Sequence, residues 1–335
     1  MLRRIGRSVL AVVPLALLAL VVVFDPEDVS DTLRDALDIR QVPPPPETVG
    51  DLSARDQAVR RVVDTITEGR VRDHVAELTR MPSRMVGYGG DLAARQYIRS
   101  QFETLGLEQI TDETFEVTVP IDRGGELRID GTGEAFPIHG LWPNDVRTPC
   151  LPAEGVGGHL IYGGKGTFED LNGLLVDGSI VLMDFGCGQN YLNAMTLGAR
   201  AIVFYDDGNV TRGEAEDKFL EVPVNVPRFW VEKDGAERLL ELASSDGSRV
   251  HLTSRMTWDT VPAHNVYGYL SGSDEPIPGR PNRRWRDRLI VVEAYYDAMS
   301  VVPALARGAE SASGTAALLE IIRALKTHGH KYSFL

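Results

Sequence analysis

The C-terminal part of the chain places polar side chains around a turn between an apolar run and a helix. The apolar run Leu289 to Tyr296 ends at Asp297, and Gly-Ala-Glu-Ser-Ala-Ser-Gly (residues 308–314) then opens a segment of helical periodicity. In open α/β folds, ligands bind where a strand ends and a loop leads to the next helix. We therefore expect any chemistry of this chain near Asp297 and residues 308–314.

Other patterns along the chain do not support a catalytic assignment. The sequence Gly-Gly-Lys-Gly-Thr (residues 163–167) lacks the spacing of a phosphate-binding loop and does not open a clear helix. Ser311 and Ser313 do not form the Gly-x-Ser-x-Gly elbow of serine hydrolases. His328 and His330 follow the end of a predicted helix, where imidazole commonly caps carbonyl groups. We interpret these residues as structural.

The chain contains two cysteines, Cys150 and Cys187. Their spacing fits no zinc or redox motif. In an oxidising compartment they could form a disulfide bond. Two separate buried thiols are the alternative.

The elements around these residues can be predicted from hydrophobic periodicity. The middle of the chain has short apolar runs bounded by glycine, which we interpret as buried strands. Prolines within the run Val222 to Trp230 indicate an edge strand or a loop. The predicted strands are 114–119, 159–162, 179–185, 201–205, 264–269, 289–296 and 332–335, and the predicted helices are 62–66, 71–78, 91–105, 191–197, 236–243 and 313–325.

The stretch Leu289 to Leu325 resembles the di-zinc aminopeptidase family that includes leucyl-type aminopeptidases, glutamate carboxypeptidase and the transferrin receptor. In that family a strand ends in Ala-His-Tyr-Asp, and a loop leads to Gly-Ala-Asp-Asp-Asn-Ala-Ser-Gly before a helix rich in Ala and Leu. The loop Leu-Thr-Arg-Met-Pro-Ser-Arg-Met-Val-Gly (residues 78–87) and the helix after it look like the family's N-terminal helix and substrate-side loop. The middle region is similar to the protease-associated domain that many members carry.

This resemblance covers about residues 60–335 and implies an α/β fold. The expected architecture is an incomplete zinc-aminopeptidase-like three-layer αβα domain with an inserted small α/β protease-associated domain. We expect residues 58–124 to be the N-terminal part of the peptidase-like domain and residues 125–260 to be the insert. Residues 261–335 would be the start of the zinc-peptidase-like core, with the family's remaining ligands lying beyond Leu335.

The resemblance also implies metal positions at Tyr295, Asp297 and Glu310, and these differ from the family pattern. The zinc-binding histidine falls on Tyr295 and the bridging aspartate falls on Glu310, whereas Asp297, which orients the histidine, is unchanged. Zinc prefers imidazole, thiolate and carboxylate ligands, and a phenol with a reference pKa of about 10 must lose its proton to bind well. We therefore expect zinc in the family but not bound by this chain.

The N-terminus indicates a membrane tether. Arginines at positions 3, 4 and 7 precede the apolar stretch Val9 to Phe24, and acidic residues follow directly. Basic residues stay on the cytoplasmic side, so we expect a signal-anchor transmembrane helix over residues 1–24 and an extracytoplasmic body. A cleaved signal peptide, giving a secreted or periplasmic protein, is the alternative. Residues 25–57 contain four consecutive prolines, which is typical of a semi-rigid linker.

Charge restricts the class of partner. The net charge of −13 makes nucleic acid an unsuitable partner, since phosphate binding needs a basic surface. The local exception is a group of arginines around Trp285, which we interpret as a solvated loop. We expect the membrane and a peptide or protein as partners.

The function expected from these observations is that of a membrane-anchored, extracytoplasmic, zinc-aminopeptidase-like protein that binds or scaffolds without catalysis. One alternative is an active zinc metallo-exopeptidase (an aminopeptidase) whose altered ligand set is completed by a longer parent chain. The other alternative is a tethered protease-associated module that binds peptides or partner proteins.

Overall fold

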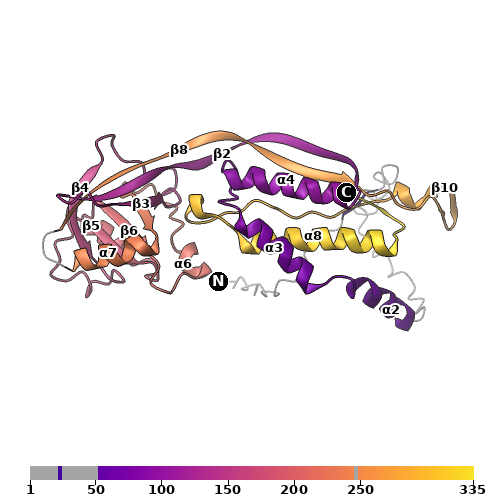
Figure 1. The fold of residues 1–335 in the computed structure, drawn as a ribbon, viewed down its shortest axis with the longest axis horizontal. Coiled ribbons are helices and arrows are strands. Elements are labelled where there is room, and N and C mark those ends of the chain that lie inside the picture. Colours follow the sequence, from indigo (N-terminus) through magenta and orange to yellow (C-terminus); the bar gives the residue numbers. More distant parts are fainter. Residues whose placement is uncertain (1–21, 25–51, 245–247) are drawn as a thin grey trace, which may run out of the picture.

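Two long paired strands join the lobes formed by the described part of the chain (Figure 1). The computed structural model describes residues 22–24, 52–244 and 248–335. Strands β2 (Glu108–Ile129) and β8 (Arg249–Tyr269) pair antiparallel from Glu108 opposite Tyr269 to Ile129 opposite Val250. Figure 1 shows this ribbon running from a barrel at one end to a group of helices at the other. We call these the barrel lobe and the helical lobe.

The barrel lobe is a closed sheet in the order β2-β3-β7-β6-β5-β4-β8. Strands β4, β5, β6 and β7 run parallel to one another, and the other pairs of the barrel are antiparallel. Every residue of β5 is buried, as expected for a parallel strand covered on both faces. The remaining barrel strands are β3 (Ala135–Gly140), β4 (Val156–Tyr162), β5 (Ile180–Asp184), β6 (Ala201–Tyr205) and β7 (Arg228–Val231).

Apolar side chains fill both faces of the barrel sheet. Leu182, Val203 and Phe229 belong to one fully buried cluster, to which helix α7 (Lys233–Ala243) contributes Leu239. Val181 belongs to a second cluster on the other face. The short helices α5 (Tyr191–Thr196) and α6 (Arg212–Glu216) connect barrel strands.

The helical lobe contains α2 (Leu52–Val63), α3 (Glu68–Arg80), α4 (Gly89–Thr104) and α8 (Ala309–His328). Ile98 and Phe102 on the apolar face of α4 pack with Leu319 of α8 and with side chains of β2 and β8. Figure 1 shows α4 beneath the ribbon and α3 beside α8. The ribbon therefore belongs to the cores of both lobes.

A small sheet in the order β1-β11-β12 completes the helical lobe. It consists of β1 (Val22–Phe24), β11 (Leu289–Val291) and β12 (Ser333–Phe334), with β1 antiparallel and β12 parallel to β11. The hairpin of β9 (Pro276–Ile277) and β10 (Arg280–Arg284) precedes β11, and the 3-10 turns are η1 (Trp285–Asp287) and η2 (Pro303–Leu305).

Three predictions of local structure need correction. The strand predicted over residues 289–296 ends at Val291, because its partners β1 and β12 pair only within Leu289–Val291. Of the two alternatives for the run Val222 to Trp230, the loop holds for residues 222–227, but the edge strand does not, because β7 begins after both prolines and is paired on each side. Of the arginines around Trp285, predicted to lie in a solvated loop, Arg283 and Arg284 lie on β10 and Arg286 lies on η1, and Arg288 alone lies in the bend between η1 and β11.

The expected membrane helix falls largely outside the described residues. Residues 22–24 of the predicted span form β1, and residues 1–21 are not described. Within the described ranges, no helix combines the length and apolar character needed to cross a bilayer. Most of the predicted linker, residues 25–51, is also outside the described residues, and residues 52–57 belong to α2. The expected insert boundaries fall inside β2 and β8.

Candidate functional site

Arg84 is the centre of a buried polar group in the helical lobe. It lies in the loop between α3 and α4, and its side chain is completely buried. Its Nε donates to the carbonyl oxygen of Arg307 at 3.0 Å, and its Nη2 donates to that of Gly308 at 2.5 Å and to Ser311 Oγ at 2.7 Å. Arg84 therefore fixes the start of α8 against the loop before α4.

The N-cap position of α8 requires a glycine. Gly308 has a φ of 59°, and a Cβ added there would lie 2.4 Å from the Cβ of Ala298 and 2.9 Å from Nη2 of Arg84. The left-handed conformation and the close approach both disfavour a side chain. Ser311 Oγ donates to the Gly308 carbonyl at 2.9 Å, which closes this first turn.

Two carboxylates lie within electrostatic reach of each other beside Arg84. Burial and repulsion from Asp297 raise the pKa of Asp91 to about 6, although Arg95 and a hydrogen bond from the Gly87 backbone oppose this shift. Burial also raises the pKa of Asp297, and a hydrogen bond from its own backbone and the charge of Arg84 reduce that shift. We call Arg84, Asp91, Asp297 and Ser311 the Arg84 cluster.

One hydrogen-bond donor of the Arg84 cluster is unsatisfied within the described residues. Arg84 Nη1 is buried and has no hydrogen-bond partner in the described part of the chain. A buried guanidinium with an unsatisfied N–H costs free energy. The nearby Asp297 carboxylate lowers that cost through its charge, without forming a direct ion pair.

Tyr295 and Glu310 lie outside the Arg84 cluster. The Tyr295 side chain is 67% exposed, and its carbonyl oxygen accepts a hydrogen bond from Thr315 Oγ1 at 3.1 Å. Glu310 is also exposed, and its Oε1 accepts a hydrogen bond from Arg212 Nη1 of the barrel lobe at 2.9 Å. The structure therefore brings Asp297 to the cluster but gives the other two predicted site residues separate surroundings.

The residues present do not fit a zinc ion. Across residues 22–24, 52–244 and 248–335, no group of three or more His, Cys, Asp or Glu side chains is arranged to hold a metal. Tyr295 supplies a phenol, and the Glu310 carboxylate is already paired with Arg212. A structural or catalytic zinc site needs at least three protein ligands at about 2.0–2.3 Å. We derive no chemistry through a metal from these side chains.

The cysteines are not bonded to each other in this structure. Cys150 is exposed and Cys187 is buried in the second barrel cluster. Burial raises the pKa of the Cys187 thiol. The sequence left two alternatives, a disulfide bond or two separate buried thiols. The thiols are separate, but only Cys187 is buried.

Arg84 and Asp91 were missed as functional candidates. The loop Pro-Ser-Arg (residues 82–84) was recognised as part of the family resemblance, but its arginine was not singled out. An arginine in a short glycine-flanked loop between two amphipathic helices could have indicated a buried guanidinium. The acidic residue in the first turn of α4 is common at helix N-termini and gave no signal of its own.

Comparison with known proteins identifies the fold. No family model and no curated protein sequence matches this chain. Among solved structures, a zinc aminopeptidase from Bacillus subtilis is similar with a TM-score of 0.51 and 19% identity, covering 79% of this chain and 60% of that chain. A peptidase M28 precursor from Shewanella amazonensis is similar with a TM-score of 0.50 and 14% identity, covering 83% and 65% respectively.

These similarities define a class of fold. The chain is a mixed α/β protein with the fold seen in zinc aminopeptidases, and it spans about three fifths of the length of the first of these structures. At sequence identities below 20%, the structural similarity shows a shared fold, and it does not show a shared activity.

Proposed function

We propose that this chain is a member of the zinc-aminopeptidase class whose peptidase-like lobe binds a peptide or protein partner without hydrolysing it. The fold supports the class, and the donor set supports the loss of catalysis. The observation that carries the second part is the exposed phenol of Tyr295 at the position where the resemblance implies imidazole. An active zinc centre in this class needs a nitrogen donor at that point.

The Arg212–Glu310 ion pair contributes less to this proposal than the phenol does. Both side chains are more than half exposed, at 73% and 53%. An exposed ion pair is worth about 0–1 kcal/mol, which a tightly bound zinc ion would easily overcome. The limiting factor is therefore the type of donor at Tyr295 and not the occupation of Glu310 by Arg212.

The remaining parts of the proposal concern location and the barrel lobe. The basic residues before the apolar stretch Val9 to Phe24 support a membrane anchor with an extracytoplasmic body. The closed barrel, which the chain enters and leaves on β2 and β8, supports a protease-associated-like insert over residues 125–260. In this arrangement the barrel lobe supplies a partner surface next to the peptidase-like lobe.

A second candidate is an active zinc exopeptidase completed by further residues. The observation in its favour is that the chain covers only 60% of the Bacillus subtilis enzyme. A zinc centre would then depend on ligands that these 335 residues do not supply. The third candidate, a tethered peptide-binding barrel, differs in needing no contribution from the Arg84 cluster.

Zinc content and hydrolysis test the proposal directly. The full chain is purified, incubated with zinc, desalted and measured by metal mass spectrometry and with aminoacyl-anilide substrates. We expect no stoichiometric zinc and no hydrolysis, because the phenol of Tyr295 is an unsuitable donor. The variant Tyr295→His/Glu310→Asp, which restores the family's donors, should bind zinc at least about tenfold more tightly than the wild type.

A matched control tests whether the ion pair between Arg212 and Glu310 affects zinc binding. Arg212→Ala releases Glu310 without changing any donor and should leave zinc binding unchanged. About two equivalents of zinc on the wild-type chain, lost in Glu310→Ala, would refute the non-catalytic proposal and favour the exopeptidase.

A further inference from the structure

The last residues of three neighbouring barrel strands bring two tyrosines and an aspartate together. Tyr162 ends β4, Asp184 ends β5 and Tyr205 ends β6, and these strands run parallel side by side. In open α/β sheets, ligands bind outside the carboxyl ends of the strands. We call these three residues the strand-end triad. Figure 1 shows their strands in the barrel lobe, across the ribbon from the helical lobe.

Three oxygen atoms form the centre of the strand-end triad. Tyr162 Oη donates to Asp184 Oδ1 at 2.6 Å, Tyr205 Oη donates to the same atom at 2.7 Å, and the two hydroxyl oxygens are 3.3 Å apart. Burial and the hydrogen bond to Asp184 raise the pKa of Tyr162, and burial and the hydrogen bonds with Tyr162 and Asp184 raise the pKa of Tyr205. Both hydroxyls therefore keep their protons. Because each has donated its one hydrogen to Asp184, it offers only lone pairs to a further partner.

The Asp184 carboxylate has no cation beside it. The residue is 8% exposed, and no basic side chain in the described part of the chain forms an ion pair with it. Its Oδ2 accepts no hydrogen bond there, yet it reaches the surface, since the fully buried polar side-chain atoms without a partner in these ranges are Arg84 Nη1 and Arg288 Nε. The charge of Asp170 adds to the negative potential around Tyr162. Buried charges are normally paired, so the strand-end triad lacks a positive charge.

The backbone and the barrel core hold the strand-end triad in place. The Asp184 backbone N–H donates to the Gly164 carbonyl at 3.0 Å, and that of Phe185 donates to the Tyr205 carbonyl at 3.1 Å. Both tyrosine rings pack against the first barrel cluster, with their centroids 6.5 Å apart and their planes tilted by 54°. The acceptor atoms are therefore positioned before a ligand arrives, which lowers the free-energy cost of binding.

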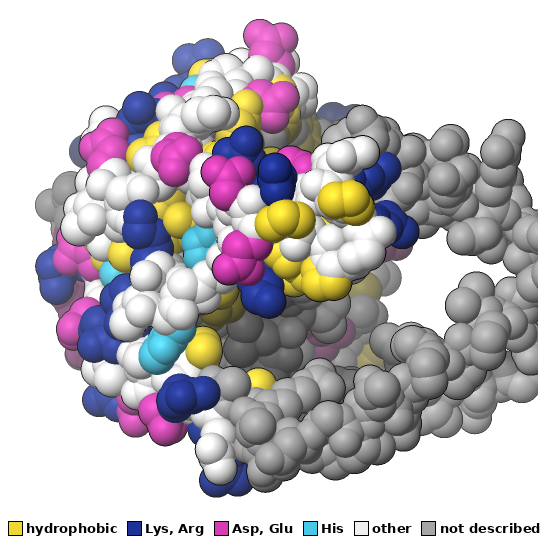
Figure 2. All heavy atoms as spheres, turned by 90° about the vertical axis from the view of Figure 1, so that its right-hand side faces the viewer, with side chains coloured by type: hydrophobic (Ala, Val, Ile, Leu, Met, Phe, Trp, Pro, Cys, Tyr) yellow, Lys and Arg dark blue, Asp and Glu magenta, His cyan; other side chains and the backbone are white. Residues whose placement is uncertain are grey.

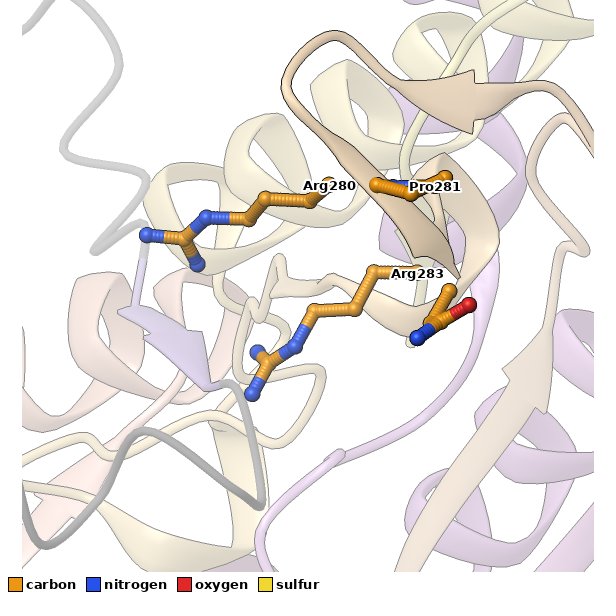
Figure 3. A pocket seen from close by; sticks show the side chains of 4 residues that line it. Arg280, Pro281 and Arg283 are labelled. Atoms are coloured by element: carbon orange, nitrogen blue, oxygen red, sulfur yellow. The ribbon is translucent and has the colours of Figure 1, made fainter.

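A hollow at the β9–β10 hairpin differs from the strand-end triad, because a single element lines it. The hollow has a volume of about 320 Å³ and is lined by residues 280–283 of β10 (Figure 3). Figure 2 views this end of the molecule, where charged and apolar side chains are mixed. No other described element lines the hollow. Binding sites place a few polar groups around one point, and the strand-end triad does so with side chains from three strands.

We propose that the strand-end triad binds the ammonium group of a peptide or protein, either a lysine side chain or a free N-terminus. An ammonium carries three N–H donors, which match the carboxylate and the two hydroxyl oxygens in number. Its charge balances that of Asp184, and charge-assisted hydrogen bonds are about twice as strong as neutral ones. The rigid planar fork of a guanidinium suits a bidentate pair of acceptors instead. This site depends on neither zinc nor peptide binding by the peptidase-like lobe.

Titration of the full chain with short peptides tests the site. The tyrosines are labelled with ¹³C at the ring carbon that carries the hydroxyl, and NMR signals are assigned with Tyr162→Phe and Tyr205→Phe. The probes are acetyl-Gly-Lys-Gly amide, Gly-Gly-Gly amide with a free N-terminus, and acetyl-Gly-norleucine-Gly amide, which has no ammonium. We expect saturable shifts of both tyrosine signals with the first or second peptide and none with the third. The peptide that binds identifies the source of the ammonium.

Substitutions within the strand-end triad should weaken this binding. Asp184→Asn removes the charge but keeps an acceptor for the hydroxyls, and it should weaken binding at least about tenfold. Tyr162→Phe and Tyr205→Phe keep the rings and should each weaken it about threefold or more. The control Asp206→Asn removes an exposed carboxylate directly after Tyr205 and should change affinity by less than about twofold.

Three results would overturn the proposal. The first is that neither ammonium peptide shifts the tyrosine signals. The second is that the norleucine peptide shifts them equally, because the ammonium would then not be what is bound. The third is that Asp206→Asn weakens binding as much as Asp184→Asn, because the general acidity of the surface, and not the strand-end triad, would then attract the peptide.

Discussion

At the scale of single residues, two neighbouring carboxylates have different positive charges beside them, Arg84 for Asp297 and Arg95 for Asp91. The hydrogen bonds of Arg84 go to carbonyl groups and Ser311, so Asp297 receives only part of the compensation that its burial demands. Arg95 and the Gly87 backbone likewise offset only part of the effect of burial on Asp91. Buried carboxylates without full compensation favour the protonated form. The cluster therefore gives the folded state a dependence on pH that an ordinary surface carboxylate would not give.

Asp91→Asn should remove the part of this pH dependence that comes from Asp91. The pKa of Asp91 is about 6 in the folded state, against about 3.9 unfolded. The contribution of Asp91 to stability is therefore fully present below about pH 4 and is lost as the pH rises through 6. We expect the stability of the wild type relative to Asp91→Asn to fall by about 1–3 kcal/mol between pH 4 and pH 7, measured by urea unfolding.

Glu103→Gln is the control for this measurement, because Glu103 is an exposed carboxylate of the same helix. A difference between wild type and Asp91→Asn that stays constant from pH 4 to pH 7 would contradict the expected titration.

At the scale of elements, the start of α4 depends on two glycines with opposite surroundings. A Cβ at Gly90 would lie 2.2 Å from the Pro82 carbonyl oxygen and 2.4 Å from that of Ser83. A Cβ at Gly89 would meet nothing within 4 Å. The Gly90 backbone N–H also donates to the Ser83 carbonyl at 3.0 Å. The loop that carries Arg84 therefore packs directly onto the backbone of α4.

Gly90→Ala should destabilise the chain, whereas Gly89→Ala should not. The clash at Gly90 forces a shift of the loop, with an expected loss of about 1–3 kcal/mol. Alanine at Gly89 favours the helix, with an expected gain of about 0.5–1 kcal/mol. Thermal unfolding of both variants checks this, and equal effects at the two positions would show that the loop does not pack as described.

Element types were predictable from the sequence where the pattern is local. The helix predicted over residues 91–105 became α4, and the glycine-bounded runs became β4, β5 and β6. Strand length was not predictable for β11, because it is set by partners far away in the chain. The position of Asp297 could be anticipated, but the Arg84 cluster could not, since Arg84 meets Ser311 across 227 residues.

At the scale of the whole molecule, the lobes are connected by packing more than by charge. Val301 and Val302 precede α8 but are buried in the second cluster of the barrel lobe. The Trp142 backbone N–H donates to the Val301 carbonyl at 2.6 Å. The Arg212–Glu310 pair also joins the lobes, but it is exposed. Apolar burial contributes about 25 cal/mol per Å², so the valines should dominate the coupling.

Val301→Ala/Val302→Ala should separate the unfolding of the lobes. Loss of this packing weakens the coupling by about 1–3 kcal/mol, and scanning calorimetry should resolve a lower transition for one lobe. Arg212→Ala should retain the cooperativity of the wild type, because an exposed ion pair contributes little. If the unfolding transitions of the lobes separate in Arg212→Ala but not in the valine variant, the ion pair and not the valine packing couples the lobes.

The antiparallel ribbon has a consequence for how such a chain can change over evolution. The polypeptide enters the barrel on β2 and returns on the neighbouring strand β8, so Thr118 and Thr260 are directly opposite, with their hydroxyl oxygens 3.2 Å apart. If the chain were cut at these two threonines and the barrel removed, a tight turn could join the two ends without moving α4 or α8. One pair of neighbouring positions on β2 and β8 is therefore enough to delimit the whole barrel within the chain.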